Sequence, residues 1–250
     1  MTSHHDRLTI IAIALVVYLL ATLVHEGLGH GGACLLTGGE FVGVSTAWCD
    51  CDKAGLEPWA VRAIKAAGCG ANLLVGAAAL LALPRVGRGA TAYFFWLLAA
   101  VNLFMCAGYL LADPIFGFGD WTAFLEGLPG WLRAPLIAAG GALAFGTIRT
   151  LNPHLGPGRV ASGRALALLP WAVVGCGVMT AAAMLNVYGM EFAISSGMAT
   201  VGGTSFLAWM HRIERGAPVE PIVVHRSRTW LLLGAVALLL LVVFGRGIVT

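Results

Sequence analysis

The sequence predicts an all-α integral membrane protein, a polytopic bundle of six to seven transmembrane helices with a short β-like segment after the first span. Hydrophobic residues make up 59% of the 250 residues and charged residues only 11%, whereas a soluble domain carries about 25% charged residues. Several apolar runs also reach the roughly 20 residues that a bilayer-crossing helix needs. We therefore expect one transmembrane domain over residues 1–250, embedded in the lipid bilayer as a multi-pass protein of the plasma (inner) membrane.

The spans follow from these apolar runs and from the polar turns between them. The expected spans cover residues 8–36, 58–83, 90–111, 131–148, 165–187, 190–210 and 230–244. The segment 190–210 is long enough to cross but contains Glu191 and many small residues, which is why the count is six to seven. Gly38 and Gly39 end the first helix, and residues 40–48 predict a short strand or hairpin, with a plain loop as the alternative.

The charge and the cysteines exclude some classes of partner and site. The formal net charge is only +3 and no basic cluster occurs, so no nucleic-acid partner is expected. The six cysteines are scattered without a C-x-x-C pair, which argues against a cysteine-based zinc finger. The sequence leaves the oligomeric state open.

The stretch His25-Glu26-Gly27-Leu28-Gly29-His30 lies at the far end of the first apolar run, and we interpret it as an H-E-x-x-H zinc motif. Its histidines are five residues apart, about 140° around an ideal α-helix, and we expect their long imidazoles to reach one ion. Two imidazoles, a carboxylate and a water form a common catalytic zinc shell, and Glu26 would be the general base. The alternative is a helix end whose polar groups merely reach the interface, but ionisable residues inside a membrane are functional candidates by default.

A third ligand is sought among the carboxylates of the break after the third span. Asp120 is our choice and Asp113 the runner-up. Their structural alternatives are a helix N-cap for Asp120 and the end of the third helix, before a proline, for Asp113. Asn72 and Asn102 in the second and third spans either contact substrate or form interhelical hydrogen bonds. His154 is expected to be a solvated loop histidine.

Orientation is predicted from the basic residues. With seven spans, ten of the 15 lysines and arginines fall on the side of the N-terminus and five on the other, so the N-terminus is expected to be cytoplasmic. The motif, the candidate strand and Asp120 then share the extracytoplasmic side. Without a span over 190–210 the charge split is nearly even and gives no orientation.

Three stretches together resemble the site-2 protease family of intramembrane zinc metalloproteases. They are His25-Glu26 with His30 in the first span, Gly70-Ala71-Asn72 in the second, and Gly119-Asp120-Trp121 after the third, and the resemblance covers about residues 10–125. It implies a Zn²⁺ held by His25, His30 and a later aspartate, with Glu26 activating water. The family's usual third element is of the Asn-Pro/Leu-Asp-Gly type, and this chain has Gly-Asp-Trp instead. Better-known members place the site toward the cytosol, opposite to the charge count.

The expected function is a zinc-dependent endopeptidase that cleaves transmembrane or juxtamembrane segments of membrane-protein or peptide substrates. Residues 8–125 would form a catalytic core of three spans and residues 131–250 would add further spans. An exposed edge at residues 40–48 would receive the unwound peptide by strand addition. Two alternatives stay open: a metal-binding membrane transporter, and a non-catalytic relative that binds membrane proteins.

Overall fold

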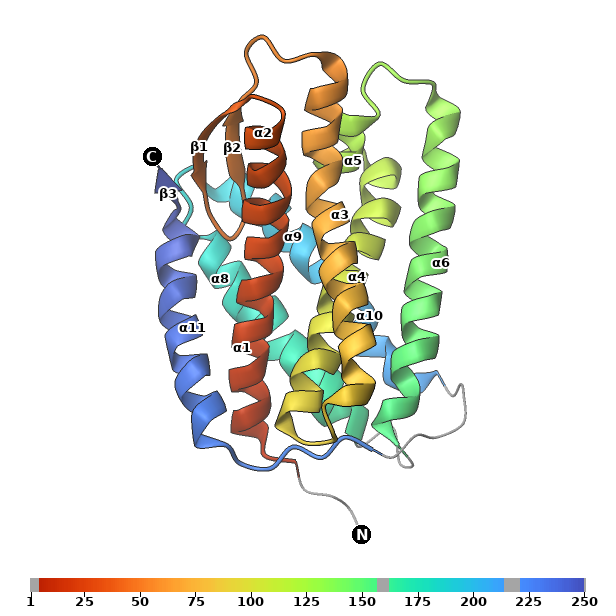
Figure 1. Cartoon of the computed structure of the whole chain (residues 1–250), viewed down its shortest axis with the longest axis vertical. Helices are drawn as coiled ribbons and strands as arrows, with labels where there is room; N and C mark the ends of the chain where they lie inside the picture. Colours follow the sequence, from red (N-terminus) through yellow and green to blue (C-terminus); the bar gives the residue numbers. More distant parts are fainter. Residues whose placement is uncertain (1–4, 157–161, 214–220, 250) are drawn as a thin grey trace.

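The computed structural model describes residues 5–156, 162–213 and 221–249, which form a helical bundle with a small sheet at one end (Figure 1). The α-helices are α1 (Arg7–Leu23), α2 (Gly32–Leu36), α3 (Pro58–Ala82), α4 (Ala90–Phe116), α5 (Gly119–Phe124), α6 (Arg133–Leu151), α8 (Met179–Ala183), α9 (Met190–Gly203), α10 (Phe206–Trp209) and α11 (Arg228–Arg246). Stretches of π-helix cover Val24–Gly31, Arg164–Leu168 and Trp171–Val178, and short 3₁₀ turns cover Leu83–Arg85, Gly130–Leu132, Asn152–Leu155 and Met210–Arg212. The strands are β1 (Glu40–Val44), β2 (Cys49–Asp52) and β3 (Ile248–Val249).

Six helical segments in the described parts of the chain are long and apolar enough to cross a membrane. They are Arg7–Leu36, Pro58–Arg85, Ala90–Phe116, Gly130–Leu155, Arg164–Ala183 and Arg228–Arg246. Large apolar side chains such as Leu74 and Leu239 are exposed on the outer faces of the bundle, where water would disfavour them and lipid would not. The helices are therefore compatible with a multi-pass membrane protein.

The prediction of a continuous span over 190–210 is wrong. Helix α9 ends at Gly203, where the weak helix formers Gly202 to Ser205 interrupt the segment before α10 begins. The broken segment still runs back along the bundle, because Gly163, before the fifth span, packs against His211 near its end. The two chain ends therefore lie at opposite ends of the bundle (Figure 1), as they would with seven crossings.

The helix of the first span changes its hydrogen-bond pattern at the motif. Residues Val24–Gly31 form a π-helix between α1 and α2, where an uninterrupted α-helix was expected. In a π-helix each N–H bonds the carbonyl five residues earlier, so residues five apart share a face. Four residues separate His25 from His30, one more than in H-E-x-x-H, and the π-helix accommodates the extra residue. The expected 140° separation is therefore wrong, and the two imidazoles lie on the same side.

The sheet confirms the predicted hairpin, but the strand with the free edge near the site is not the one expected. Strand β1 pairs antiparallel with β2, with a bulge between Phe41 and Gly43, and its other edge pairs with β3 near the end of the chain. Strand β1 is thus central, so the free edge nearest the site belongs to β2 rather than to residues 40–48 as a whole. A disulfide between Cys34 and Cys51 ties β2 to α2, a pairing that no pattern in the sequence indicates.

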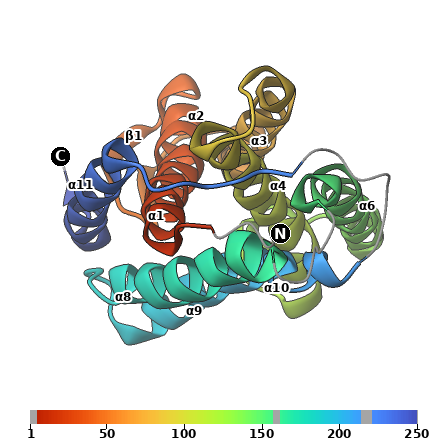
Figure 2. The ribbon, with the colours of Figure 1, turned by 90° about the horizontal axis from the view of Figure 1, so that it is seen from below.

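Helix α4 is the centre of the bundle. It contacts α1, α3, α6 and α9, and the view from below shows these helices around it, with α11 on the outer side of α1 (Figure 2). Helix α3 packs on the π-helix of the first span. The approach is so close that a Cβ at Gly29 would lie 2.5 Å from the Cα of Gly68. Two glycines therefore allow this backbone approach, which brings the motif against α3.

Candidate metal centre

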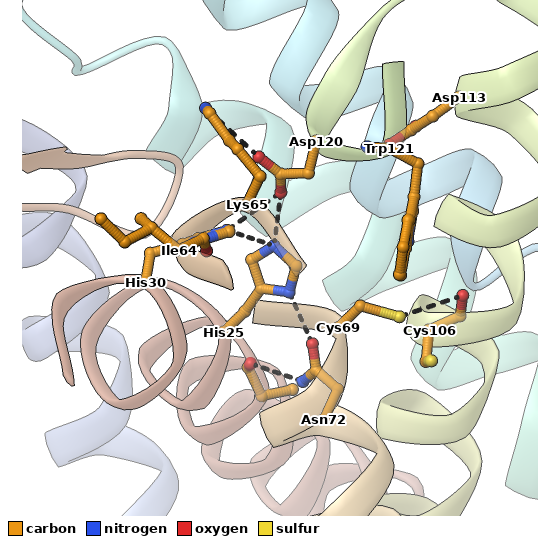
Figure 3. A network of polar contacts seen from close by, with 11 residues as sticks. His25, His30, Ile64, Lys65, Cys69, Asn72, Cys106, Asp113, Asp120 and Trp121 are labelled. Carbon is orange, nitrogen blue, oxygen red and sulfur yellow. Dashed lines mark hydrogen bonds and ion pairs between the residues drawn. The ribbon is translucent and has the colours of Figure 1, made fainter. Parts of the chain in front are cut away.

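Three side chains from two elements converge at the upper end of the bundle. The Nε2 atoms of His25 and His30, both in the π-helix, are 3.2 Å apart. Asp120, in the first turn of α5, places its Oδ2 atom 3.3 Å from the His25 nitrogen and 2.9 Å from the His30 nitrogen (Figure 3). These three side chains could hold a metal ion.

Asn72 of α3 fixes the orientation and the tautomer of His25. Its Nδ2 group donates to the carbonyl of Ala21 and to Oδ1 of Asn102, and neither of these oxygens can donate in return. The Asn72 oxygen therefore faces His25 and accepts a hydrogen bond from Nδ1, 2.7 Å away. With its proton on Nδ1, a neutral His25 carries a lone pair on Nε2, which points toward His30 and Asp120.

The same helix also contacts the other two side chains. The carbonyl of Ile64, an acceptor only, lies 2.7 Å from Nδ1 of His30 and therefore leaves a lone pair on its Nε2. The Lys65 ammonium lies 3.6 Å from Oδ1 of Asp120, the oxygen that faces away from the imidazoles. Hydrogen-bonded partners of this kind fix the direction of an imidazole ligand. Helix α3 thus provides a hydrogen-bond acceptor for each imidazole and a longer ionic contact for Asp120.

Gly68 lies between these partners and leaves the space at the centre. A Cβ at this position would lie 2.5 Å from Nε2 of His30 and 2.7 Å from Nε2 of His25. The atoms that would bind an ion therefore face the bare backbone of α3. No pattern in the sequence distinguishes this glycine from the other 33.

The electrostatics of the group call for a positive charge at its centre. Burial raises the pKa of Asp120, but its contacts with the His25 and His30 imidazoles outweigh burial and hold the pKa well below its usual range, so the side chain is a carboxylate at neutral pH. Two imidazole lone pairs and a carboxylate oxygen at these distances repel one another unless a proton or a metal cation lies among them. The acceptors on α3, the Asn72 side-chain oxygen and the Ile64 carbonyl, direct the two imidazole lone pairs toward Asp120.

Glu26 lies beside the group without belonging to it. Its buried side chain lines a cavity of about 700 Å³ together with His30 and Asp120. The walls of the cavity come from the π-helix, the β1–β2 hairpin, α3, α4, α5 and α9. The lining includes Trp48, Asp50, Lys53, Lys65, Tyr109, Tyr188, Glu191 and Ser196. Helix α9, expected to be a peripheral span, therefore forms one wall of the site.

Two further groups in the cavity have clear chemical characters. Tyr109 stacks its ring on His25, with ring centroids 4.8 Å apart, and so packs the imidazole from the side of α4. Burial, with the neighbouring Glu26 and Asp50 carboxyls, raises the pKa of Cys49 to about 12. Its thiol is therefore protonated at neutral pH in the metal-free protein, and Cys49 is not among the residues whose ligand atoms come together in the metal-binding group.

The remaining predicted residues have other contacts. Asp113 lies outside the metal-binding group, and its carboxylate accepts the backbone N–H of Trp121 at 3.0 Å, which holds α5 in place. Helix α4 continues past Asp113 to Phe116, so this residue does not end the helix. Asn72 and Asn102 are fully buried and form the interhelical hydrogen bonds that the sequence left as one of two readings. Neither of them is among the residues that line the cavity.

Two further residues, His154 and Lys65, differ from what the sequence predicted. His154 is partly buried in the 3₁₀ turn Asn152–Leu155 that follows α6, and it is not a solvated loop histidine as expected. Lys65 was not predicted as a site residue, although a signal existed: it lies several residues inside the expected span 58–83, which also contains Arg62, and ionisable side chains inside a span are rarely without a role.

Comparisons with protein-family models, with curated proteins and with solved structures each gave no match. The case for any function therefore rests on the geometry of the site.

Proposed function

We propose that this protein is an intramembrane zinc endopeptidase that cleaves transmembrane or juxtamembrane peptide segments. The observation that carries the proposal is the convergence of the His25, His30 and Asp120 lone pairs, with Glu26 beside them in the same cavity. A carboxylate next to a metal-binding group, but outside it, is the arrangement that hydrolytic zinc sites use.

The separations of the three ligand atoms fit zinc. Tetrahedral coordination with zinc–nitrogen and zinc–oxygen bonds of about 2.0–2.2 Å places neighbouring ligand atoms about 3.4 Å apart. The observed separations are 3.2, 3.3 and 2.9 Å. Two imidazoles and one carboxylate also leave a fourth position, as catalytic zinc sites require.

The residues of the chain divide the proposed reaction among them. A zinc ion held by the three ligands would polarise the scissile carbonyl and lower the pKa of water to about 7. Glu26 takes one proton from the attacking water as its oxygen bonds to the carbonyl carbon, and gives a proton to the leaving nitrogen as the carbon–nitrogen bond breaks. The products are one new carboxylate and one new amine, so no further reactant is needed.

The substrate reaches the site as an extended chain in this proposal. The peptide groups of a helix are already hydrogen-bonded, so a helical substrate must unwind before attack. Strand β2 has an unpaired edge, and its residues Cys49 and Asp50 line the cavity. An unwound segment pairing with β2 would have its backbone aligned by hydrogen bonds and would lie close to Glu26.

The site is proposed to face the extracytoplasmic side. The Cys34–Cys51 disulfide lies at the same end of the bundle as the site, and structural disulfides persist in oxidising compartments rather than in the cytosol. The distribution of basic residues supports the same orientation, because the segment 190–212 returns to the end where the chain begins. Two of the ten residues counted there, Arg159 and Arg215, lie outside the described residues.

The transporter alternative is less well supported. An ion path would have to continue from the metal-binding group toward the other end of the bundle. In the described part of the chain that interior is filled by fully buried large side chains, among them Tyr18, Tyr93 and Trp96. A packed core of this kind favours a site reached from one side.

The substitution Glu26→Gln tests the proposal. Glutamine keeps the shape of the side chain but cannot take the proton, so cleavage should fall by at least about a hundredfold while zinc stays bound. The variants are reconstituted in lipid vesicles with single-span synthetic peptides that carry glycine or proline near the site end, and products are followed by mass spectrometry beside the zinc content. Glu191→Gln changes another cavity carboxylate and serves as the matched control. Near-normal cleavage by zinc-loaded Glu26→Gln would remove the general base and with it the mechanism.

A further inference from the structure

Lys65 is a cation in the cavity whose ammonium group has few partners. Its Nζ atom lies 3.6 Å from Oδ1 of Asp120, longer than the roughly 2.7–2.9 Å of a charge-assisted hydrogen bond. The structure gives this ammonium no other hydrogen bond among the described residues. Its side chain is one third exposed and lines the cavity, so its remaining N–H groups are available to a bound molecule.

Its position is fixed relative to the metal-binding group. Lys65 follows Ile64, whose carbonyl holds His30, and its ammonium contacts Asp120 (Figure 3). It is also close enough to Glu26 to interact with that carboxyl electrostatically. The cation therefore stands beside both the proposed base and a proposed ligand, without any rearrangement of the helix that carries it.

A lysine at this place is a disadvantage for metal binding alone, because its charge repels a cation. It becomes useful when negative charge develops in the cavity. In peptide hydrolysis that charge develops on the oxygen of the scissile carbonyl, and donors already in place stabilise it without reorganisation. Lys65 has the charge, the donors and the exposure for this task.

We propose that Lys65 is a further catalytic residue of this site, which donates a hydrogen bond to the oxyanion that forms on the scissile carbonyl. The proposal rests on the proposed peptidase function. Lys65 gains and loses no proton in the step, since Glu26 carries the proton from water to the leaving nitrogen. Its contribution is the charge and the N–H donor alone.

The test measures anion binding at the centre, so that no cleavable substrate is required. The full chain in detergent is loaded with Co²⁺, and acetohydroxamate is titrated while the visible absorption of cobalt is recorded. Lys65→Met should weaken acetohydroxamate binding at least tenfold, and Lys65→Arg should stay within about threefold of the unsubstituted protein. Lys53 lines the same cavity but donates to the carbonyl of Cys51, so Lys53→Met is the matched control and should bind normally.

Each outcome separates this proposal from the function on which it rests. If the unsubstituted protein binds no cobalt, the metal-dependent function fails. If Lys65→Met holds cobalt and binds acetohydroxamate normally, only the role of Lys65 fails. Loss of cobalt from Lys65→Met but not from Lys65→Arg would make Lys65 a positioning residue for Asp120 and would also overturn the oxyanion role.

Lys65→Gln, which keeps donors without charge, is measured in parallel in case the methionine variant does not fold. It should also weaken acetohydroxamate binding at least tenfold, and normal binding would overturn the role. With a cleaved peptide, kcat of Lys65→Met should fall by about 10²–10³ with little change in KM.

Discussion

Replacing Gly68 by alanine should remove metal binding while leaving the fold intact. The new Cβ would lie 2.5 and 2.7 Å from the Nε2 atoms of His30 and His25, which falls 0.9 and 0.7 Å short of an ordinary contact at 3.4 Å. Metal–ligand distances tolerate only about ±0.2 Å, so the imidazoles would move several times farther than the centre allows. Loss of one supporting partner typically costs 10–100-fold in affinity. Displacement of two ligands at once should cost at least about a hundredfold, or about 2.8 kcal/mol.

Gly70→Ala is the matched control, because nothing lies within 4 Å of a Cβ at that position on the same helix. Alanine favours helix over glycine by up to about 1 kcal/mol at both sites, so neither variant should lose α3. Zinc affinity is measured in detergent by competition with a chelating dye, with thermal unfolding recorded beside it. If Gly68→Ala binds zinc as tightly as Gly70→Ala, the ion does not sit among the three proposed ligands.

Two further predictions concern the third ligand and the orientation. Asp120→Asn should lower zinc affinity by at least about tenfold, whereas Asp113→Asn should keep zinc and lower the thermal stability, since its carboxylate only holds α5; zinc loss from the Asp113 variant alone would reverse the assignment. In a Cys49→Ser background, a membrane-impermeant maleimide added to intact cells should label Ala54→Cys at the site end and leave Gly89→Cys at the other end unlabelled. The opposite labelling pattern would place the site in the cytosol.

The spans were predictable because each rests on a continuous apolar run. The segment 190–212 was harder, since its small residues satisfy the hydropathy of a span while Gly202 and Gly203 end the helix. The hydropathy of a segment indicates whether it is apolar enough to lie in lipid. It does not indicate whether the segment forms one unbroken helix. The returning path depends on packing of the kind seen between Gly163 and His211, and such long-range contacts leave no local pattern.

The members of the group that could hold a metal ion were predictable from residue types, and their geometry was not. The choice of Asp120 over Asp113 agrees with the group that the structure brings together, but the π-helix had no signal in the apolar periodicity. A π-helix arises when one extra residue is accommodated within a helix, and here the odd spacing of His25 and His30 was the only trace of it. The partners on α3 escaped notice because a backbone carbonyl, such as that of Ile64, has no signature in sequence.

The three-stranded sheet sets an order of events during synthesis. Strand β1 follows the first span, whereas β3 follows α11, so their pairing waits until residues 248–249 have left the ribosome. Gly247, just before β3, packs against Trp48, which lines the cavity. A nascent copy therefore carries its ligand set well before this part of the cavity wall is supported. Under the proposed function, such a delay would keep an unfinished chain from cleaving neighbouring proteins while it is still being inserted.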